Sequence, residues 1–322
     1  YIRRGEVIVR STLYDWGEFK WQYDLDSNIW RDLYWRKVDA DNNRTLTVGN
    51  QKEPMGLDFL MGNKFGTAME RSAPSNTFGS LRGTGSRLNN WFDRAPEDQF
   101  VRFGDESTAY ITTTVGLFTQ DIEDTTETDY ALTGRTTTGK LVGDRGMHFG
   151  ASASVRDGSF RRIAPRPEAQ DAGRLVLASL HADQQTVGAL EGIATRGPLH
   201  AQAEFYYSDY RGGDIDGYGY GGYAMVGYFL TGETREYRPK WGLWAPLPHS
   251  AKSVFEVFAR VSHTYGESDL DNGNYLTNIT VGGSWYLRRL RTSINAVYSQ
   301  VDKDIKGEDN GLAITTRLQY LF

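Results

Sequence analysis

Arginine and lysine recur in this sequence on rows in which every second residue is polar. An arginine side chain presents several N–H donors in a planar fork and stays charged at any relevant pH, which suits tetrahedral oxyanions such as phosphate or sulfate. Rows of such charge along a wide aqueous passage can select among ions. The cationic residues on these rows are Arg4, Arg10, Lys20, Arg36, Arg135, Arg156, Arg260, Arg288 and Arg317.

Acidic residues share these rows and reduce their positive charge. They are Glu6, Asp24, Asp32, Glu191, Glu204 and Glu256. The rows therefore carry a net charge of +3 (nine minus six), although the whole chain carries −5, and the acidic segment 120–129 accounts for much of the difference. For each cation an alternative stays open, in which the charge only solvates the polar row and is neutralised by a neighbour.

The rows exist because apolar and polar residues alternate along the segments that carry them. Near the C-terminus, Leu312, Ile314 and Leu318 fall on one row, whereas Arg317 and Gln319 fall on the other. Successive side chains of a β-strand point to opposite faces, so this alternation predicts strands with one apolar and one polar face. A sustained helical spacing is absent from the sequence, and the chain is therefore predicted to be all β.

Each alternating segment is about 9–12 residues long, which a strand tilted near 45° needs to cross a bilayer. We predict fifteen strands, at 2–13, 17–25, 28–37, 43–50, 81–91, 106–119, 129–139, 146–156, 186–196, 199–210, 219–230, 253–265, 274–288, 291–301 and 311–322. Short connections are expected at the periplasmic end and long ones outside. Because single-chain bacterial barrels have an even strand number, a sixteenth strand is expected before Tyr1. The prediction is one transmembrane antiparallel β-barrel domain over 1–322.

A soluble β-sandwich is the alternative fold, since its strands alternate as well. Sandwich strands are usually about half as long, and full charges on the polar row fit a water-filled lumen better than a face beside a dry core. Tryptophan and tyrosine gather near predicted strand ends, as they do at the two surfaces of a membrane. These residues are Trp16, Trp21, Trp30, Trp35, Tyr206, Tyr207, Tyr210 and Trp285.

Other classes of protein find little support in the composition. The chain has no cysteine, which excludes disulfides, cysteine-bound metals and thiol catalysis. Its histidines are scattered without metal-ligand spacing and a nucleophile motif is lacking, so we expect neither an enzyme nor a cofactor or metal. The acidic net charge argues against a nucleic-acid partner. Segment 232–252 is too long for a tight turn, and is expected to fold at the periplasmic end or to dock at a subunit interface.

Several sequence blocks, in their order along the chain, resemble the phosphate-selective porins of the O and P type. The blocks are RRG at 3–5, GNQKEPMGLD at 49–58, MERS at 69–72, RPE at 166–168, RLV at 174–176 and FLTGE at 229–233. The resemblance implies a homotrimeric, sixteen-stranded anion channel in the outer membrane of a Gram-negative bacterium. It also implies that the third and fifth loops fold inward. The predicted strands place these loops at 51–80 and 157–185.

The two loops carry further candidate residues. Segment 51–80 contains Lys52, Lys64 and Arg71. By resemblance, Arg71 and Thr67 line the constriction, whereas the alternative is that Arg71 pairs with Glu70 or the wall and holds the loop. The resemblance also places an arginine ladder in the fifth loop, at Arg161, Arg162, Arg166 and Arg174. This ladder is thinned here, because Ala164 occupies the position between Arg162 and Arg166.

These observations predict a passive diffusion channel that prefers small anions, with phosphate or polyphosphate as candidate permeants. Outer-membrane lipid and lipopolysaccharide would contact the apolar rows. Two alternatives remain open, a general diffusion porin without ion preference and a plugged barrel with a structural or adhesive role.

Overall fold

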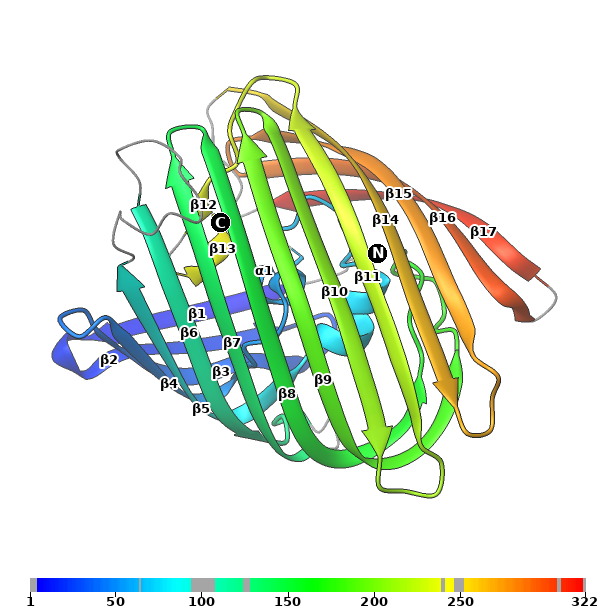
Figure 1. Ribbon diagram of the computed structural model, residues 1–322. Helices are drawn as coiled ribbons and strands as arrows, with labels where there is room; N and C mark the ends of the chain where they lie inside the picture. Colours follow the sequence, from blue (N-terminus) through cyan, green and yellow to red (C-terminus); the bar gives the residue numbers. More distant parts are fainter. Residues whose placement is uncertain are drawn as a thin grey trace.

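The computed structural model describes residues 5–63, 65–93, 108–123, 128–238, 241–245, 252–305 and 308–320. Fifteen strands of the described chain form one antiparallel sheet in chain order, which confirms the all-β prediction (Figure 1). They are β1 (Glu6–Leu13), β2 (Gly17–Asp24), β3 (Ile29–Asp39), β4 (Arg44–Lys52), β5 (Arg82–Asp93), β6 (Thr108–Thr119), β7 (Thr128–Val142), β8 (Arg145–Ile163), β9 (Ala178–Arg196), β10 (Leu199–Arg211), β11 (Gly217–Phe229), β14 (Val254–Ser268), β15 (Asn274–Leu287), β16 (Leu290–Ile305) and β17 (Glu308–Tyr320).

The remaining elements are short. A separate hairpin of β12 (Tyr237–Arg238) and β13 (Leu243–Trp244) lies in the chain between β11 and β14, which pair directly with each other in the large sheet. Helical segments are limited, among the described residues, to α1 (Leu57–Met61), a 3-10 turn (Tyr14–Trp16) and a π-helical turn (Ser75–Gly79). None of these helical segments has the length and apolar character needed to cross a membrane.

The alternation in the sequence decides which side of each strand faces outward. In β14, Glu256 and Arg260 point inward and are 1% and 3% exposed, whereas Val257 and Val261 point outward and are 41% and 50% exposed. Other strands repeat this arrangement, with polar rows buried inside and apolar rows exposed. A β-sandwich would bury its apolar rows, so the sandwich alternative is wrong. The exposed apolar surface requires lipid around it.

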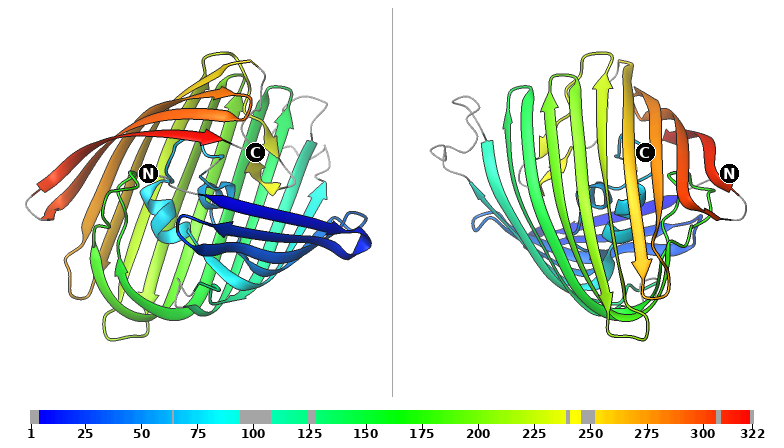
Figure 2. Two further views of the ribbon diagram at one scale, coloured as in Figure 1. Left: turned by 180° about the vertical axis from the view of Figure 1, so that it is seen from behind. Right: turned by 45° about the vertical axis from the view of Figure 1, so that its right-hand side comes forward.

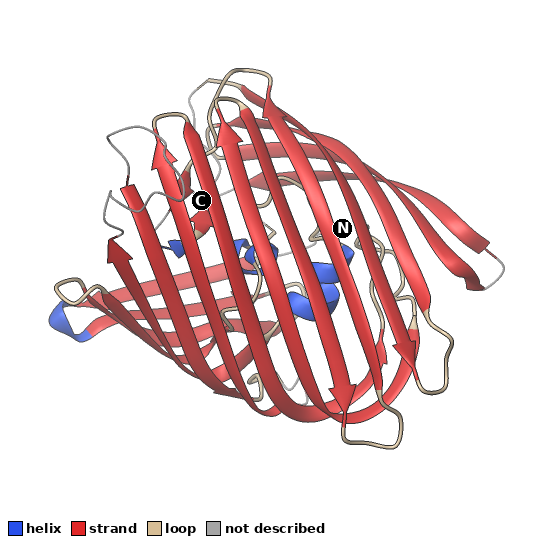
Figure 3. Cartoon of the chain, in the orientation of Figure 1, coloured by secondary structure: helices blue, strands red, loops and turns tan. Residues whose placement is uncertain are grey.

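The sheet curls around an interior that contains α1, the π-helical turn and the β12–β13 hairpin (Figure 2, Figure 3). Its edge strands, among the described residues, are β1 and β17. The sixteenth strand expected before Tyr1 stays a prediction.

Strands β8 and β9 are each eight residues longer than predicted (19 against 11), which corrects the bounds of one loop. β8 extends to Ile163 and β9 begins at Ala178, so the inward connection runs only over 164–177 and not over 157–185. The pairing of β8 with β9 shifts register between Asp157 and Arg162. Such irregularities break the alternation from which the strand ends were predicted. Arg161 and Arg162 therefore lie on a strand.

A second correction concerns Arg288. It was assigned to the polar row of a strand over 274–288, but β15 ends at Leu287, and Arg288 lies exposed in the turn before β16. Its φ of +53° is a left-handed conformation that L-residues adopt mainly in tight turns. The alternation alone cannot tell the last residue of a strand from the first residue of a turn.

The interior has its own apolar contacts, which join the inward segments to each other. Leu57 and Met61 of α1 pack in one buried cluster with Ile193 of β9 and with Tyr237 and Trp244 of the hairpin. The described part of the segment 230–253 therefore folds into the interior together with the loop 53–81 (Figure 2).

Candidate functional site

The loop 53–81 is fixed to the wall through Glu204 of β10. Its carboxylate accepts hydrogen bonds from the backbone N–H groups of Leu57 (2.5 Å) and Asp58 (2.9 Å). The hydroxyls of Tyr206 and Tyr223 donate to the same carboxylate, at 2.8 and 2.5 Å. Burial raises the pKa of Asp58, which itself accepts a hydrogen bond from a backbone N–H within the loop. These contacts place α1 against β10 and β11.

A second anchor holds the loop further along, at Thr67. Arg291 of β16 donates to the carbonyl oxygens of Gly66 (2.7 Å) and Thr67 (2.6 Å). The Thr67 hydroxyl donates to Glu256 of β14 at 2.9 Å and accepts a hydrogen bond from Arg235. Thr67 is buried in these contacts, and lies outside the cavity described below.

A third anchor joins both inward loops to β14 and β15. Glu168 of the connection 164–177 accepts hydrogen bonds from Arg260 (2.5 Å) and Ser262 (2.7 Å) of β14, and from Thr280 (2.5 Å) of β15. Its other contact is the backbone N–H of Ala73, at 3.1 Å. One buried carboxylate therefore ties the connection 164–177 and the loop 53–81 to the same part of the wall.

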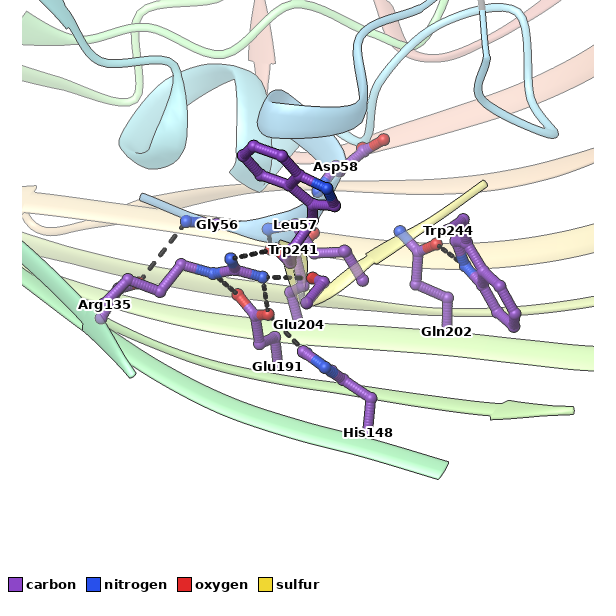
Figure 4. A network of polar contacts seen from close by, with 12 residues as sticks. Gly56, Leu57, Asp58, Arg135, His148, Glu191, Gln202, Glu204, Trp241 and Trp244 are labelled. Atoms are coloured by element: carbon purple, nitrogen blue, oxygen red, sulfur yellow. Dashed lines mark hydrogen bonds and ion pairs between the residues drawn. The ribbon is translucent and has the colours of Figure 1, made fainter. Parts of the chain in front are cut away.

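The β12–β13 hairpin is held by a separate polar network (Figure 4). Arg135 of β7 pairs with Glu191 of β9 at 2.5 Å and donates to the Gly242 carbonyl oxygen at 2.7 Å. His148 bridges Glu191 (2.7 Å) and the Tyr237 hydroxyl (2.6 Å). The indole N–H of Trp244 donates to Gln202 at 2.8 Å, so the turn of the hairpin is fastened on both sides.

A cavity of about 520 Å³ remains between these inward segments and the wall formed by β1 to β7. Cations dominate its lining. Those among the described lining residues are Arg10, Lys20, Arg31, Arg36, Lys52, Arg71, Arg82, Arg87, Arg135 and Arg238, and the acidic residues are Glu6 and Asp32. The lining thus carries a formal charge of +8 (ten minus two).

The cavity lining is positive because most acidic residues of the interior are bound to the inward segments and do not face the cavity. Glu168, Glu191, Glu204 and Glu256 are buried and hydrogen-bonded to the inward segments or to the residues that hold them. Asp32 lines the cavity but is neutralised by Lys20 and by Arg82, whose Nη2 lies 2.7 Å away. The carboxylates fasten the loops, and most cations of the first strands are left facing the cavity.

Aromatic rings lie beneath several of these cations. The guanidinium carbon of Arg71 lies 4.7 Å from the centre of the Phe59 ring, and Lys52 Nζ lies 4.8 Å from it. Arg36 lies 4.7 Å from the Tyr34 ring centre. Cation–π contacts of this kind orient a side chain without neutralising its charge.

The predicted site residues fall into groups in the structure. Six line the cavity: Arg10, Lys20, Arg36, Lys52, Arg71 and Arg135. Three point inward and hold the loops: Arg156, which pairs with Glu53 at 2.6 Å, Arg260, and Arg317, which donates to the Met69 carbonyl oxygen at 3.2 Å. Arg4 and Lys64 lie outside the described residues.

The arginines of the predicted ladder lie elsewhere. Arg161 and Arg162 are exposed at the end of β8, while Arg166 and Arg174 lie on the connection 164–177. Burial and the positive charges of Arg166 and Arg162 lower the pKa of Arg174, so these three guanidinium groups form one cationic cluster. The cluster is not part of the cavity lining.

Four cavity cations were absent from the sequence prediction: Arg31, Arg82, Arg87 and Arg238. Arg87 could have been assigned to the polar row from the sequence, because its neighbour Leu88 is on the apolar row of the predicted strand 81–91. Arg31 and Arg82 lie near strand ends, and Arg238 lies on the inward hairpin. For these three, the direction of the side chain depends on how the connections fold. Among the described residues, no three histidine or acidic side chains group as metal ligands.

An apolar exterior, a polar interior and segments folded into the lumen define the class of the protein, an outer-membrane porin. The chain belongs to the phosphate-selective porin O and P family, whose model matches residues 1–322. This places it in the outer membrane of a Gram-negative bacterium. The resemblance stated from the sequence blocks is thereby confirmed.

Two relatives share about a third of their aligned residues with this chain. An uncharacterised protein of Caulobacter vibrioides is 30% identical over 213 residues, 60% of this chain and 40% of the relative. Porin O of Pseudomonas aeruginosa is 31% identical over 156 residues, 42% of this chain and 35% of the relative. The aligned parts thus span less than half of each relative.

The fold has similar solved structures as well. The outer-membrane protein OmpT of Vibrio cholerae superposes with a TM-score of 0.56 at 12% identity, over 99% of this chain and 89% of that one. At this identity the similarity concerns the fold alone.

Proposed function

We propose that this protein is a passive channel that prefers small anions. The observation that carries the proposal is the cavity beside β1 to β7, with ten cations and two acids among its described lining residues. A positively charged passage with low-dielectric walls raises the local concentration of anions and repels cations. Membership in the phosphate-selective porin O and P family supports the same direction.

The permeation path runs between the inward segments and the first strands. Arg71 contributes from the side of the loop, and Arg10, Arg36, Lys52 and Arg87 contribute from the wall. The cationic cluster of Arg162, Arg166 and Arg174 would act before anions reach the cavity, by attracting them toward the entrance of the channel. Catalysis has no part in this proposal.

The decisive measurement is the reversal potential of the purified protein in planar bilayers under a gradient of potassium chloride. In an anion channel the reversal potential has the sign of the equilibrium potential of chloride. A potential set by potassium would overturn the proposal, and a potential near zero would favour a general diffusion porin.

Phosphate or polyphosphate as the preferred permeant is the finer proposal. Block of the chloride current by millimolar phosphate would support a specific site, whereas simple additive conductance would indicate general flow of anions. A specific phosphate site requires N–H donors that are not already used in hydrogen bonds within the protein. Several cavity cations already donate such hydrogen bonds to protein oxygens.

A plugged barrel is the competing class, because three segments occupy the lumen. Liposome swelling with small neutral solutes separates the two, since a plugged barrel gives no swelling. We further propose the homotrimer as the assembly, with lipid and lipopolysaccharide around it. Projection images of the protein in membranes would count the subunits.

A further inference from the structure

An exposed tryptophan faces the cationic cavity. Trp241 lies in the turn between β12 and β13, lines the cavity and is 39% exposed. Its neighbour Trp244 also lines the cavity but is only 4% exposed, and its indole N–H is bonded to Gln202. A large aromatic side chain that is exposed to water on the wall of a cavity is a feature of ligand-binding sites.

The backbone of Trp241 and Gly242 is bound to the wall by Arg135. Arg135 donates to the carbonyl oxygens of Trp241 (3.4 Å) and Gly242 (2.7 Å) from the wall, as Figure 4 shows. Gly242 has a φ of +57°, and a Cβ atom there would lie 2.5 Å from Thr137 Oγ1 of β7, so the turn packs closely on the wall. A backbone fixed in this way loses little conformational freedom when a ligand binds.

A cation lies opposite this ring. The Arg36 guanidinium carbon of β3 is 5.9 Å from the centre of the Trp241 ring and 4.7 Å from the Tyr34 ring, which is buried. The guanidinium therefore contacts two aromatic rings from different parts of the chain. Arg36 Nε donates to Thr47 Oγ1 at 3.3 Å, so a carboxylate would be bound in a bidentate manner by the two Nη groups of Arg36.

We propose that Arg36 and Trp241 form a binding subsite for aromatic carboxylates within the anion path. The carboxylate accepts hydrogen bonds from Arg36, and the ring of the ligand stacks on Trp241. The inference rests on the proposed anion channel and names a class of permeant for it. Phosphate carries no apolar face, so it gains nothing from the tryptophan ring. The cavity volume of about 520 Å³ is in the range of sites for small organic molecules.

The test compares two carboxylates of equal charge and similar size, benzoate and cyclohexanecarboxylate, as blockers of the chloride current in planar bilayers. Benzoate should block at a concentration lower by about threefold or more, since stacking and cation–π contacts favour the planar ring. Trp241→Leu should bring the ratio of the two blocking concentrations to about one, and Trp241→Phe should restore most of the difference. Trp21→Leu is the matched control, because Trp21 is exposed on the outer face of β2.

Arg36→Gln separates the two parts of the subsite. It should weaken the block by both carboxylates and leave benzoate the stronger blocker, because the ring of Trp241 remains. A wild-type protein that is blocked equally by both carboxylates, or a ratio unchanged in Trp241→Leu, overturns the subsite and leaves anion selectivity standing.

A binding measurement keeps the two proposals separate. Saturation-transfer NMR on the detergent-solubilised protein should show transfer to the benzoate ring protons that falls at least threefold in Trp241→Leu and stays unchanged in Trp21→Leu. This result supports the subsite even if bilayer recordings reject the anion channel. Equal transfer in wild type and Trp241→Leu overturns the subsite, whatever the reversal potential.

Discussion

Glu168 of the connection 164–177 and Arg260 of β14 form a buried ion pair, with 2.5 Å between Oε2 and Nη2. The same carboxylate accepts a hydrogen bond from the N–H of Ala73 in the other inward loop. Both side chains lie in the polar interior, with 0% and 2% of their side-chain surface exposed. A pair that connects two loops and a strand determines where both loops lie in the lumen.

Glu168→Gln should therefore loosen both loops. Removing one partner of a buried ion pair costs about 3–5 kcal/mol, because the other charge is left without compensation. We expect a lower midpoint of urea unfolding in detergent and a noisier open-channel current. Asp171→Asn is the matched control, since Asp171 is exposed on the same connection. Equal effects of the two substitutions would show that the ion pair does not hold the loops.

Arg71→Glu should lower the preference for anions more than Arg162→Glu does. Arg71 lines the cavity, and its reversal changes the lining charge from +8 to +6, whereas Arg162 belongs to the outer cluster. A unit charge 4 Å from an ion in bulk water changes the energy of the ion by about 1 kcal/mol. Arg71→Glu changes two units of charge and acts in opposite directions on chloride and potassium, so the ratio of chloride to potassium permeability should fall by about tenfold or more. Reversal potentials measure both. Unchanged selectivity in both variants would place the constriction elsewhere.

Anion preference should weaken as salt is raised. The Debye length is about 10 Å at 0.1 M and about 3 Å at 1 M, so concentrated salt screens the arginines from an ion in the middle of the passage. Reversal potentials at a constant concentration ratio, measured from low to high salt, would follow this change. Selectivity that does not depend on salt would mean that ions are bound at close contact instead of being guided by the field of the lining.

Gly242→Ala should displace the turn that carries Trp241. The alanine Cβ would lie 2.5 Å from Thr137 Oγ1, in addition to the cost of a left-handed residue, which is about 1 kcal/mol. We expect an altered single-channel conductance. Gly143→Ala has the same backbone cost, with a φ of +55°, but its Cβ would meet nothing within 4 Å. A conductance change in Gly143→Ala as large as in Gly242→Ala would exclude the clash as the cause.

The alternation of residues predicted the strands because it is a local property of the backbone. The alternation places Glu256 and Arg260 on the row opposite to the apolar residues Val257 and Val261, and both are buried inside. The same rule fails where a strand ends or shifts register. It extended the strand over 274–288 one residue too far, to Arg288, although β15 ends at Leu287. It also ended the strand that contains Arg162 too early, because the register of β8 against β9 shifts there.

The contents of the lumen depended on contacts between distant residues. Arg135 reaches the Gly242 carbonyl oxygen across 107 positions of the chain, and Thr67 reaches Glu256 across 189. Such contacts leave no periodic signal, so the sequence showed 232–252 only as a long connection and left Arg238 and Trp241 unassigned.

The sequence by itself determined that the chain is all β and which rows are polar, because both follow from residue spacing. It also determined the family, because the sequence blocks of that family follow one another in order along the chain. The tertiary structure alone decided which charges face the open cavity. The inner acids are buried under the inward segments that they bind, and the cations of the first strands remain opposite them, a separation that arises only when the loops fold into the lumen.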